Sequence, residues 1–330
     1  MNENYSIEKP LITVVTVTYN SSAYVRDAIE SVLANAYQNF EYLISDDCSS
    51  DHTWDIIREY KDPRIKAWRN EPNLGEYNNR NKCIQRATGE FIFFVDGDDI
   101  LLYRGLEDAV REISRFPDCG FGVVRPGSPK FIGPVELKRE DAINLEFFGG
   151  GVLDSSVTNN VYRTSFIKRN LFLTQYKAAD TFTRINFLKK TNVLVLYSNV
   201  SIWRQSPTQA SRKISHQQLH GEILDFFKHY VFDDPDFLTK DQKEKLKPYY
   251  YRVLFKYLIG SVKDRPRANK FKDFFMDPFW KAIKYTRKPM DHSFWDHYTY
   301  NNINLNVEPN VRKAMRSGNT PVTIPGKTIL

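Results

Sequence analysis

Short apolar runs alternate with amphipathic stretches along the first hundred residues of the chain. Four runs rich in β-branched and aromatic side chains predict strands, at residues 11–20, 40–45, 64–70 and 91–95. Between them, apolar side chains recur with a helical period in three segments, residues 21–37, 49–60 and 71–90. This alternation predicts an α/β fold with a mostly parallel sheet and helices on both of its faces.

Polar residues follow three of these predicted strands. The stretch "TYN" ends at Asn20, "SDD" ends at Asp47, and "DGDD" runs from Asp96 to Asp99. Parallel sheets of this kind bind ligands beyond the carboxyl ends of their strands. We therefore expect the three polar stretches to converge along one rim and to form a binding site there.

The acidic cluster "DGDD" directly follows the buried-strand pattern "FIFFV". Two carboxylates about 4 Å apart repel by roughly 4 kcal/mol at an effective dielectric of about 20, so the cluster needs a cation or another partner. Mg²⁺ and Mn²⁺ suit it, because they take one or two carboxylates and complete their shells with water and phosphate oxygens. The simpler alternative is an Asp-Gly turn that caps the next helix.

The pattern changes along the rest of the chain. It predicts helices at residues 101–115, 164–172 and 178–190 and further strand within residues 192–205, whereas residues 119–154 are turn-rich and give no clear element. From about residue 211 it predicts long amphipathic helices, at residues 216–232, 243–263 and 270–286. We therefore divide the chain into an α/β domain, residues 1–211, and a helical region, residues 212–330.

Charge supports the same division. The chain has 330 residues and a formal net charge of +7. Residues 212–330 hold 22 Lys and Arg against 13 Asp and Glu, so the whole basic excess lies in the helical region. The two parts of the chain are thus expected to have different roles.

Several classes of protein are excluded by what the sequence lacks. No GxGxxG or GxxxxGK[ST] motif follows the first strand, which argues against dinucleotide and P-loop sites. The three cysteines match no zinc or disulfide spacing, and the paired histidines His216 and His220 have no third ligand at a suitable spacing. There is neither a secretory signal pattern nor an uncharged apolar run of about 20 residues. We expect a soluble cytoplasmic protein.

Three blocks of the sequence together resemble one known family. The blocks "ITVVTVTYNSSAYVRDAIESVL", "FEYLISDDCSSDHTWDII" and "NLGEYNNRNKCIQRATGEFIFFVDGDD" are similar to the successive signatures of family 2 glycosyltransferases with the GT-A fold. They cover roughly residues 11–106, and a weaker match continues to about residue 211. The resemblance implies a nucleotide-binding half at about 1–106 and an acceptor half at about 107–211. It also implies inverting transfer of a sugar from a nucleotide donor, with a divalent metal, Mn²⁺ or Mg²⁺.

The resemblance further implies which residues bind the donor and the metal. Tyr19 would lie against the nucleotide base, Asp47 would bind the pyrimidine ring, which favours UDP, and Arg80 would approach the diphosphate. Asp98 would be the main metal ligand, and Asp96 would share the metal or contact the ribose. The complete set of donor-binding residues is Thr18, Tyr19, Asp47, Asn73, Arg80, Asp96 and Arg204.

Three of these assignments have simpler alternatives. Tyr19 fits an ordinary aromatic residue at a strand end, and Arg80 fits a solvated charge on a helix. Arg204 fits an ion pair at the edge of the core. Many relatives also carry a His two residues after this Arg, where the present chain has Ser206, so one expected ligand is missing.

An inverting transfer needs a general base, because the acceptor hydroxyl loses its proton as it attacks. By resemblance the candidate is Asp180 in "KAADTFTRINFLKK", although Ala179 stands where an acid is frequent in the family. The alternative for Asp180 is a helix N-cap. The two roles are compatible, since a capping carboxylate can also face a cleft.

The basic helical region is rich in Tyr, Phe and Trp, as in "KPYYYRVLFKYLIGSVK". Such helices can lie on an anionic membrane surface, which would suit a lipid-linked acceptor. They can equally pack on the first domain or on a second subunit. No nucleic-acid-binding module is recognisable.

The sequence thus predicts a metal-dependent inverting glycosyltransferase of bacterial surface-polysaccharide type, acting on a saccharide or lipid-linked acceptor, with peripheral membrane contact and oligomerisation left open. A nucleotidyltransferase would need a Gly-rich basic loop after the first strand, and "TVTYNSSAY" is not one. A non-catalytic nucleotide-sugar-binding or membrane-associated scaffold protein remains the alternative.

Overall fold

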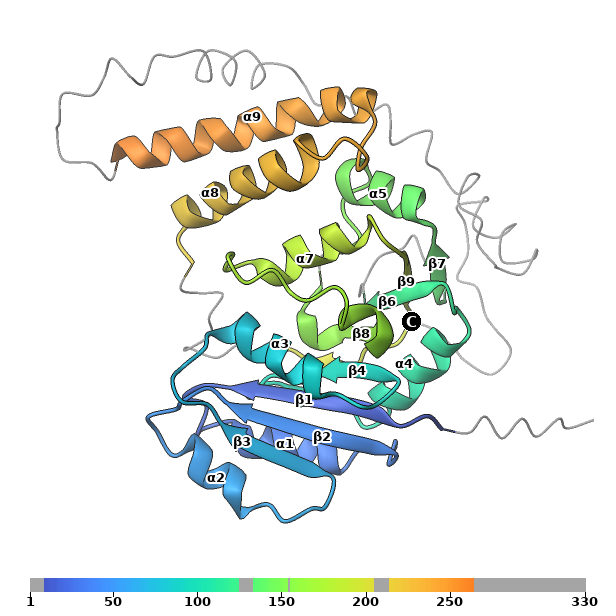
Figure 1. Cartoon of the computed structure of the whole chain (residues 1–330), viewed down its shortest axis with the longest axis vertical. Helices are drawn as coiled ribbons and strands as arrows, with labels where there is room; N and C mark the ends of the chain where they lie inside the picture. The colour runs from blue at the N-terminus through green and yellow to red at the C-terminus, as the bar shows by residue number, and fades with distance from the viewer. Residues whose placement is uncertain (1–8, 125–132, 154, 205–213, 264–330) are drawn as a thin grey trace, which may run out of the picture.

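The computed structural model of the chain describes residues 9–124, 133–153, 155–204 and 214–263 (Figure 1). Within these residues the main sheet comprises β1 Ile12–Thr18, β2 Phe40–Asp46, β3 Ile65–Arg69, β4 Phe91–Phe94, β6 Cys119–Val124, β7 Val135–Leu137, β8 Asn160–Arg163 and β9 Asn192–Leu196. The strand order is β3-β2-β1-β4-β8-β6-β9-β7.

The first half of the sheet is parallel, as the sequence predicts. Strands β3, β2, β1 and β4 pair in parallel, so their carboxyl ends lie along one edge. The helices between them are α1 Val25–Leu33, α2 Thr53–Glu59 and α3 Glu76–Arg86. Apolar side chains of α1 and α2 pack against one face of the sheet and those of α3 against the other. The predicted α/β fold is confirmed.

The second half of the sheet is mixed. Strand β8 pairs antiparallel with both β4 and β6, β6 pairs parallel with β9, and β7 pairs antiparallel with β9. The predicted helix at residues 101–115 starts too early. Residues Ile100–Leu101 form strand β5, which pairs antiparallel with β10 Ser201–Ile202, and helix α4 spans only Gly105–Ser114.

Helices cover the second half and continue beyond it. They are α5 Arg139–Phe148, the 3₁₀ turn η1 Val157–Asn159, α6 Thr164–Ile167, α7 Ala179–Phe187, α8 His216–Phe226, the π-helical segment η3 Phe227–Phe232 and α9 Lys240–Lys263. Helices α7, α8 and α9 lie in successive layers on the α3 side of the sheet (Figure 1). The predicted helix at residues 270–286 lies outside the described residues, as does Ser206.

The aromatic side chains of α8 and η3 pack inward. Phe226 stacks on Phe182 of α7 with ring centroids 4.6 Å apart, and Phe226, Phe227 and Val231 belong to the same buried cluster as the strands. In this part of the helical region, the aromatic side chains therefore pack on the first domain.

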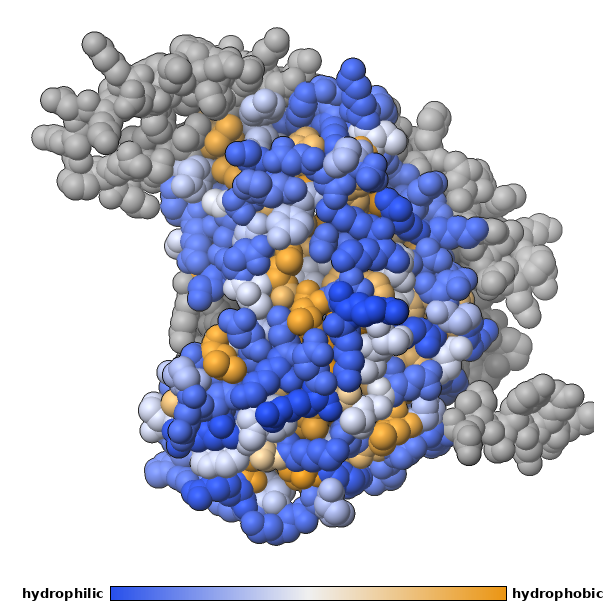
Figure 2. Space-filling view, viewed as in Figure 1, coloured by the Kyte–Doolittle hydropathy of each residue, from blue (hydrophilic) through white to orange (hydrophobic). Residues whose placement is uncertain are grey.

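The surface agrees with this arrangement. The face shown in Figure 2 is mostly hydrophilic, with hydrophobic residues in small separate areas. Among the described helices, none is both long and apolar enough to span a bilayer.

Candidate active site

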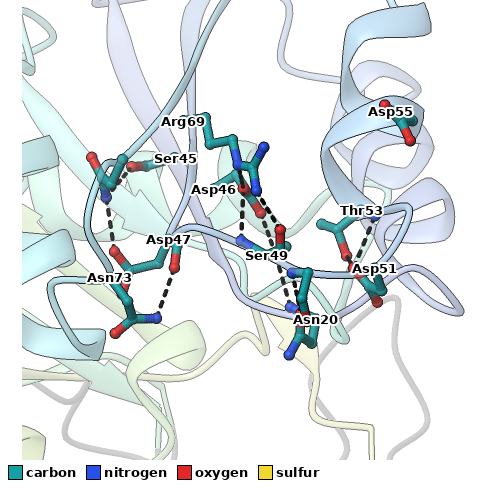
Figure 3. Close-up of polar contacts among 12 residues, drawn as sticks. Asn20, Ser45, Asp46, Asp47, Ser49, Asp51, Thr53, Asp55, Arg69 and Asn73 are labelled. Atoms are coloured by element: carbon teal, nitrogen blue, oxygen red, sulfur yellow. Dashed lines mark hydrogen bonds and ion pairs between the residues drawn. The ribbon is translucent and has the colours of Figure 1, made fainter.

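The polar strand ends meet at one edge of the sheet, as predicted. At the end of β2, the adjacent residues Asp46 and Asp47 have different partners (Figure 3). The Asp46 carboxylate accepts hydrogen bonds from the backbone and side chain of Ser49 and forms an ion pair with Arg69 (3.4 Å). Asp46 is wholly buried, and its bonds hold the turn after β2.

Asp47 holds the loop that leads into α3. Its Oδ1 accepts from the Leu74 N–H (2.9 Å) and its Oδ2 from the Gly75 N–H (2.9 Å). The Asn73 amide donates to the Asp47 carbonyl oxygen at 2.7 Å. Gly75 has a φ of +81°, which favours glycine. Asn73 and Asp47, both predicted as donor-binding residues, are therefore in direct contact.

Thr18 and Tyr19 lie at the end of β1, next to "DGDD". Thr18 is buried, whereas Tyr19 is 53% exposed. A Cβ atom at Gly97 would lie only 2.6 Å from the Thr18 Oγ1, so Gly97 allows the two strand ends to approach each other. The exposed ring of Tyr19 leaves its face accessible to a planar ligand.

Arg80 is not the solvated charge of the simpler alternative. Its side chain is 1% exposed and donates to Asp96 (2.7 Å) and to Glu76 (2.9 Å). Burial by itself would lower the pKa of Arg80. The two carboxylates raise this pKa by more than burial lowers it, so the guanidinium stays charged. Burial raises the pKa of Asp96, and the nearby acidic side chains raise it more. Arg80 opposes these effects only in part, so the pKa rises to about 7.

Asp99 connects the acidic loop, residues 96–99, to the segment that follows β10. Its Oδ1 accepts from the backbone N–H of Arg204 at 2.9 Å. Burial raises the pKa of Asp99 to about 6. The Arg204 guanidinium pairs with Asp27 of α1 (2.9 Å) and lies over the Tyr24 ring. This ion pair matches the simpler alternative for Arg204, and its role in donor binding stays a prediction.

The expected metal can be tested against the residues present. Over the described part of the chain, no three His, Cys, Asp or Glu side chains lie together so as to hold a metal ion. Asp98 and Asp96 are both partly exposed at this rim, and they offer two carboxylates. Mg²⁺ and Mn²⁺ often take only one or two protein carboxylates, with the remaining positions filled by water and phosphate oxygens. These two carboxylates therefore fit such a cation if a phosphorylated ligand is also bound.

Asp180 lies in the first turn of α7, and its side chain is 22% exposed. It is not the N-cap of the alternative, because the capping position is Ala178 and no side chain caps the helix there. The hydroxyl of Tyr77 on α3 donates to Asp180 Oδ1 (3.3 Å). Helix α3 thus contacts both the acidic loop, through Arg80, and the candidate base, through Tyr77.

Two residues of this site were not predicted from the sequence. Tyr77 stands in the block "NLGEYNNRN" with no feature that singles it out. Glu222 of α8 accepts from the backbone N–H groups of Lys177 (2.9 Å) and Ala178 (3.1 Å), immediately before α7. No local signal in the sequence points from α8 to α7, so only the packing of the helices brings this carboxylate to the start of α7.

The comparison with protein families agrees with this geometry. Residues 13–173 match the family model described as glycosyl transferase family 2. Residues 13–173 of the chain therefore form a domain of glycosyl transferase family 2. The resemblance seen in the sequence is confirmed.

Its relatives include glycosyltransferases of bacterial surface polymers. TuaG of Bacillus subtilis (strain 168), named for teichuronic acid biosynthesis, is 36% identical over 151 residues, which are 43% of this chain and 60% of TuaG. The poly(ribitol-phosphate) beta-N-acetylglucosaminyltransferase TarS of Staphylococcus aureus (strain Mu50) is 28% identical over 192 residues, which are 56% of this chain and 34% of TarS. The chain thus spans less than two thirds of the length of either relative.

Solved structures share the fold. The structure of S. aureus TarS 1-349 in complex with UDP-GlcNAc has a TM-score of 0.57 at 20% identity and covers 83% of this chain and 79% of that one. The mannosyltransferase PcManGT from Pyrobaculum calidifontis, in complex with GDP-Man and Mn²⁺, has a TM-score of 0.56 at 15% identity, with 79% and 77% covered. The GT-A-like fold is confirmed.

Proposed function

We propose that this protein is a metal-dependent inverting glycosyltransferase that moves a hexosyl or N-acetylhexosaminyl group from a UDP-sugar to a saccharide or lipid-linked acceptor. The observation that carries the proposal is the position of helix α3. Its Arg80 pairs with Asp96 of the acidic loop, and its Tyr77 contacts Asp180. A donor-binding rim and a candidate base are therefore joined through one helix.

The nucleotide would bind at the ends of β1 and β2. Tyr19 would stack on the base, since its ring is more than half exposed. Asp47 would accept from the N–H of uracil at Oδ2, which accepts from the Gly75 N–H and has a second lone pair, whereas Oδ1 already accepts from the Leu74 N–H and the Asn70 amide. TarS, which is a relative by sequence as well as by fold, has a complex with UDP-GlcNAc, whereas PcManGT has one with GDP-Man; we therefore propose UDP.

The leaving nucleoside diphosphate gains negative charge as its bond to the sugar breaks, so the site must supply positive charge there. Arg80 would stabilise this charge, while its pair with Asp96 fixes the loop. A bound Mn²⁺ or Mg²⁺ would be held by Asp98 and Asp96 and would act as a Lewis acid on the phosphate oxygens.

Asp180 would take the proton of the acceptor hydroxyl. In a single displacement, the acceptor oxygen bonds to the anomeric carbon as the bond from that carbon to the phosphate oxygen breaks. The electron pair of the broken bond leaves with the nucleoside diphosphate, and the acceptor proton moves to the Asp180 carboxylate. The partial exposure of Asp180 supports this role, because an acceptor can reach it.

The setting we propose is the synthesis of a bacterial surface polysaccharide, on the cytoplasmic side of the cell membrane. TuaG and TarS, which are named for such polymers, support it. A peripheral membrane contact would come from the basic helical region, residues 212–330, where Lys and Arg outnumber Asp and Glu.

Donor binding and transfer test this proposal. UDP-sugars with Mn²⁺ should raise the melting temperature by several degrees, because a ligand that binds only the folded state stabilises it. UDP release should fall at least about 100-fold in Asp98→Ala and in Asp180→Asn, whereas Asp241→Asn on the exposed face of α9 should match the wild type. Stabilisation by UDP-sugars without any release would favour the scaffold alternative. Full turnover by Asp180→Asn would make the base assignment wrong.

A further inference from the structure

The Asp180 carboxylate is held by donors from two directions. The Tyr77 hydroxyl of α3 donates to Oδ1 at 3.3 Å, and Arg184, one turn further along α7, donates to Oδ2 at 3.1 Å. Each carboxylate oxygen thus has one protein donor and room for a further hydrogen bond. The exposed part of Asp180 is where an acceptor hydroxyl would have to approach.

Both donors are themselves fixed. Arg184 is wholly buried, and the same Nη2 atom also donates to the Ser155 carbonyl oxygen at 2.8 Å. The Tyr77 ring packs against Phe172, with centroids 5.8 Å apart. Burial raises the pKa of Tyr77 well above its ordinary value, and Asp180 adds to the effect, so the hydroxyl remains a donor at every physiological pH.

We propose that Tyr77 is a positioning residue for the general base: it orients the Asp180 carboxylate and stabilises its charged form. This inference rests on the proposed role of Asp180. With Arg184 on the opposite oxygen, Tyr77 restricts rotation of the carboxylate and leaves a lone pair on each oxygen for the acceptor hydroxyl. Because Tyr77 belongs to α3, which also carries Arg80, it couples the orientation of the base to the donor-binding helix.

The test is Tyr77→Phe, which removes the hydroxyl and keeps the ring that packs on Phe172. A hydrogen bond to the charged form lowers the pKa of a carboxyl group. The other ionisable groups that face Asp180, namely Arg184 on α7 and Tyr162 on β8, are unchanged in the variant. The acid limb of the kcat profile should therefore move to higher pH.

The plateau value of kcat should also fall roughly tenfold, while KM for the donor stays the same. The assay is UDP release from UDP-N-acetylglucosamine or UDP-glucose with Mn²⁺, using water as acceptor, across a range of pH. The matched control is Tyr60→Phe, which removes another hydroxyl that donates to a carboxylate, Glu30 (3.1 Å), on the exposed side of α1. The control should leave both kcat and its pH profile unchanged.

The outcomes distinguish the positioning role of Tyr77 from the proposed transferase function. If Asp180→Asn loses activity but Tyr77→Phe keeps the wild-type kcat and acid limb, the positioning role of Tyr77 is wrong and the transferase proposal stands. A lower kcat with an unmoved acid limb also overturns the inference, since it would show an effect that does not pass through Asp180. If the wild type releases UDP from neither donor, the proposed UDP-sugar transferase fails, and the role of Tyr77 fails with it.

Discussion

Asp99 is only 1% exposed, whereas Asp96 and Asp98 of the same loop are partly exposed. Burial raises its pKa to about 6, and the Arg204 N–H and the Thr158 hydroxyl only partly oppose the change. An unfolded Asp has a pKa of about 3.9, so between about pH 4 and pH 6 the folded state binds this proton more tightly than the unfolded state. Stability should therefore fall as the pH rises through this window, and the loss is complete above it.

The variant Asp99→Asn should lose this dependence. We compare the fall in the free energy of unfolding in urea between about pH 4.5 and about pH 7.5, without divalent cations. This fall should be smaller in Asp99→Asn than in the wild type, by about 2 kcal/mol. Asp241→Asn, whose carboxylate is 75% exposed, should keep the wild-type slope. Parallel curves for Asp99→Asn and the wild type would contradict the prediction.

The positions of individual candidate residues could be predicted where a strand dictates them. Thr18, Asp47 and Asp96 directly follow apolar runs, and parallel pairing brings such positions to one edge. Tyr77 could not be found in this way. Its partner Asp180 is 103 residues away in the chain, and their contact depends on how α7 packs over α3.

At the scale of elements, the same distinction between local and long-range information applies. Strands β1, β2 and β4 were predicted because each is a short buried run rich in β-branched or aromatic side chains. Leu101 was assigned to a helix because it is apolar and adjoins the helical pattern of α4, but Ile100–Leu101 form strand β5. It is a strand only because Ser201–Ile202 pairs with it from a hundred residues away.

Glu222 gives an element-level prediction, since it ties α8 to the segment that begins α7. Its carboxylate accepts from two backbone N–H groups, at Lys177 and Ala178. Glu222→Ala should lower the free energy of unfolding by about 1 kcal/mol, because it removes two hydrogen bonds to a charged acceptor at a partly exposed position. It should also lower kcat, because Asp180 lies two residues further along. Urea titration and UDP release measure the two effects.

The control for Glu222 is Glu244→Ala on α9, whose side chain is half exposed and pairs with Lys247. A surface ion pair of this kind contributes at most about 1 kcal/mol and has no route to Asp180. If Glu244→Ala and Glu222→Ala reduced kcat equally, α8 would have no specific role in holding α7.

For the whole molecule, charge and packing divide the chain differently. Net charge separates residues 1–211 from 212–330, but the buried core crosses that boundary. Phe226, Phe227 and Val231 lie in one cluster with side chains of α7 and of the sheet. The sequence could indicate the change of composition at residue 211, but it could not show that α8 and η3 bury aromatic side chains on the first domain.

A fragment of residues 1–211 should therefore fail to fold as an independent domain. It would expose the aromatic surface of α7 that Phe226 covers, and burial of each such side chain contributes roughly 1.5–3 kcal/mol, against a total stability of about 5–15 kcal/mol. We expect little soluble fragment, strong binding of a hydrophobic dye and no cooperative thermal transition. A fragment of residues 1–263 retains α8 and α9 and should unfold cooperatively, at a temperature close to that of the whole chain. If residues 1–211 alone unfolded cooperatively within a few degrees of the whole chain, α8 and α9 would be an appendage, and Glu222 could not be needed to hold α7.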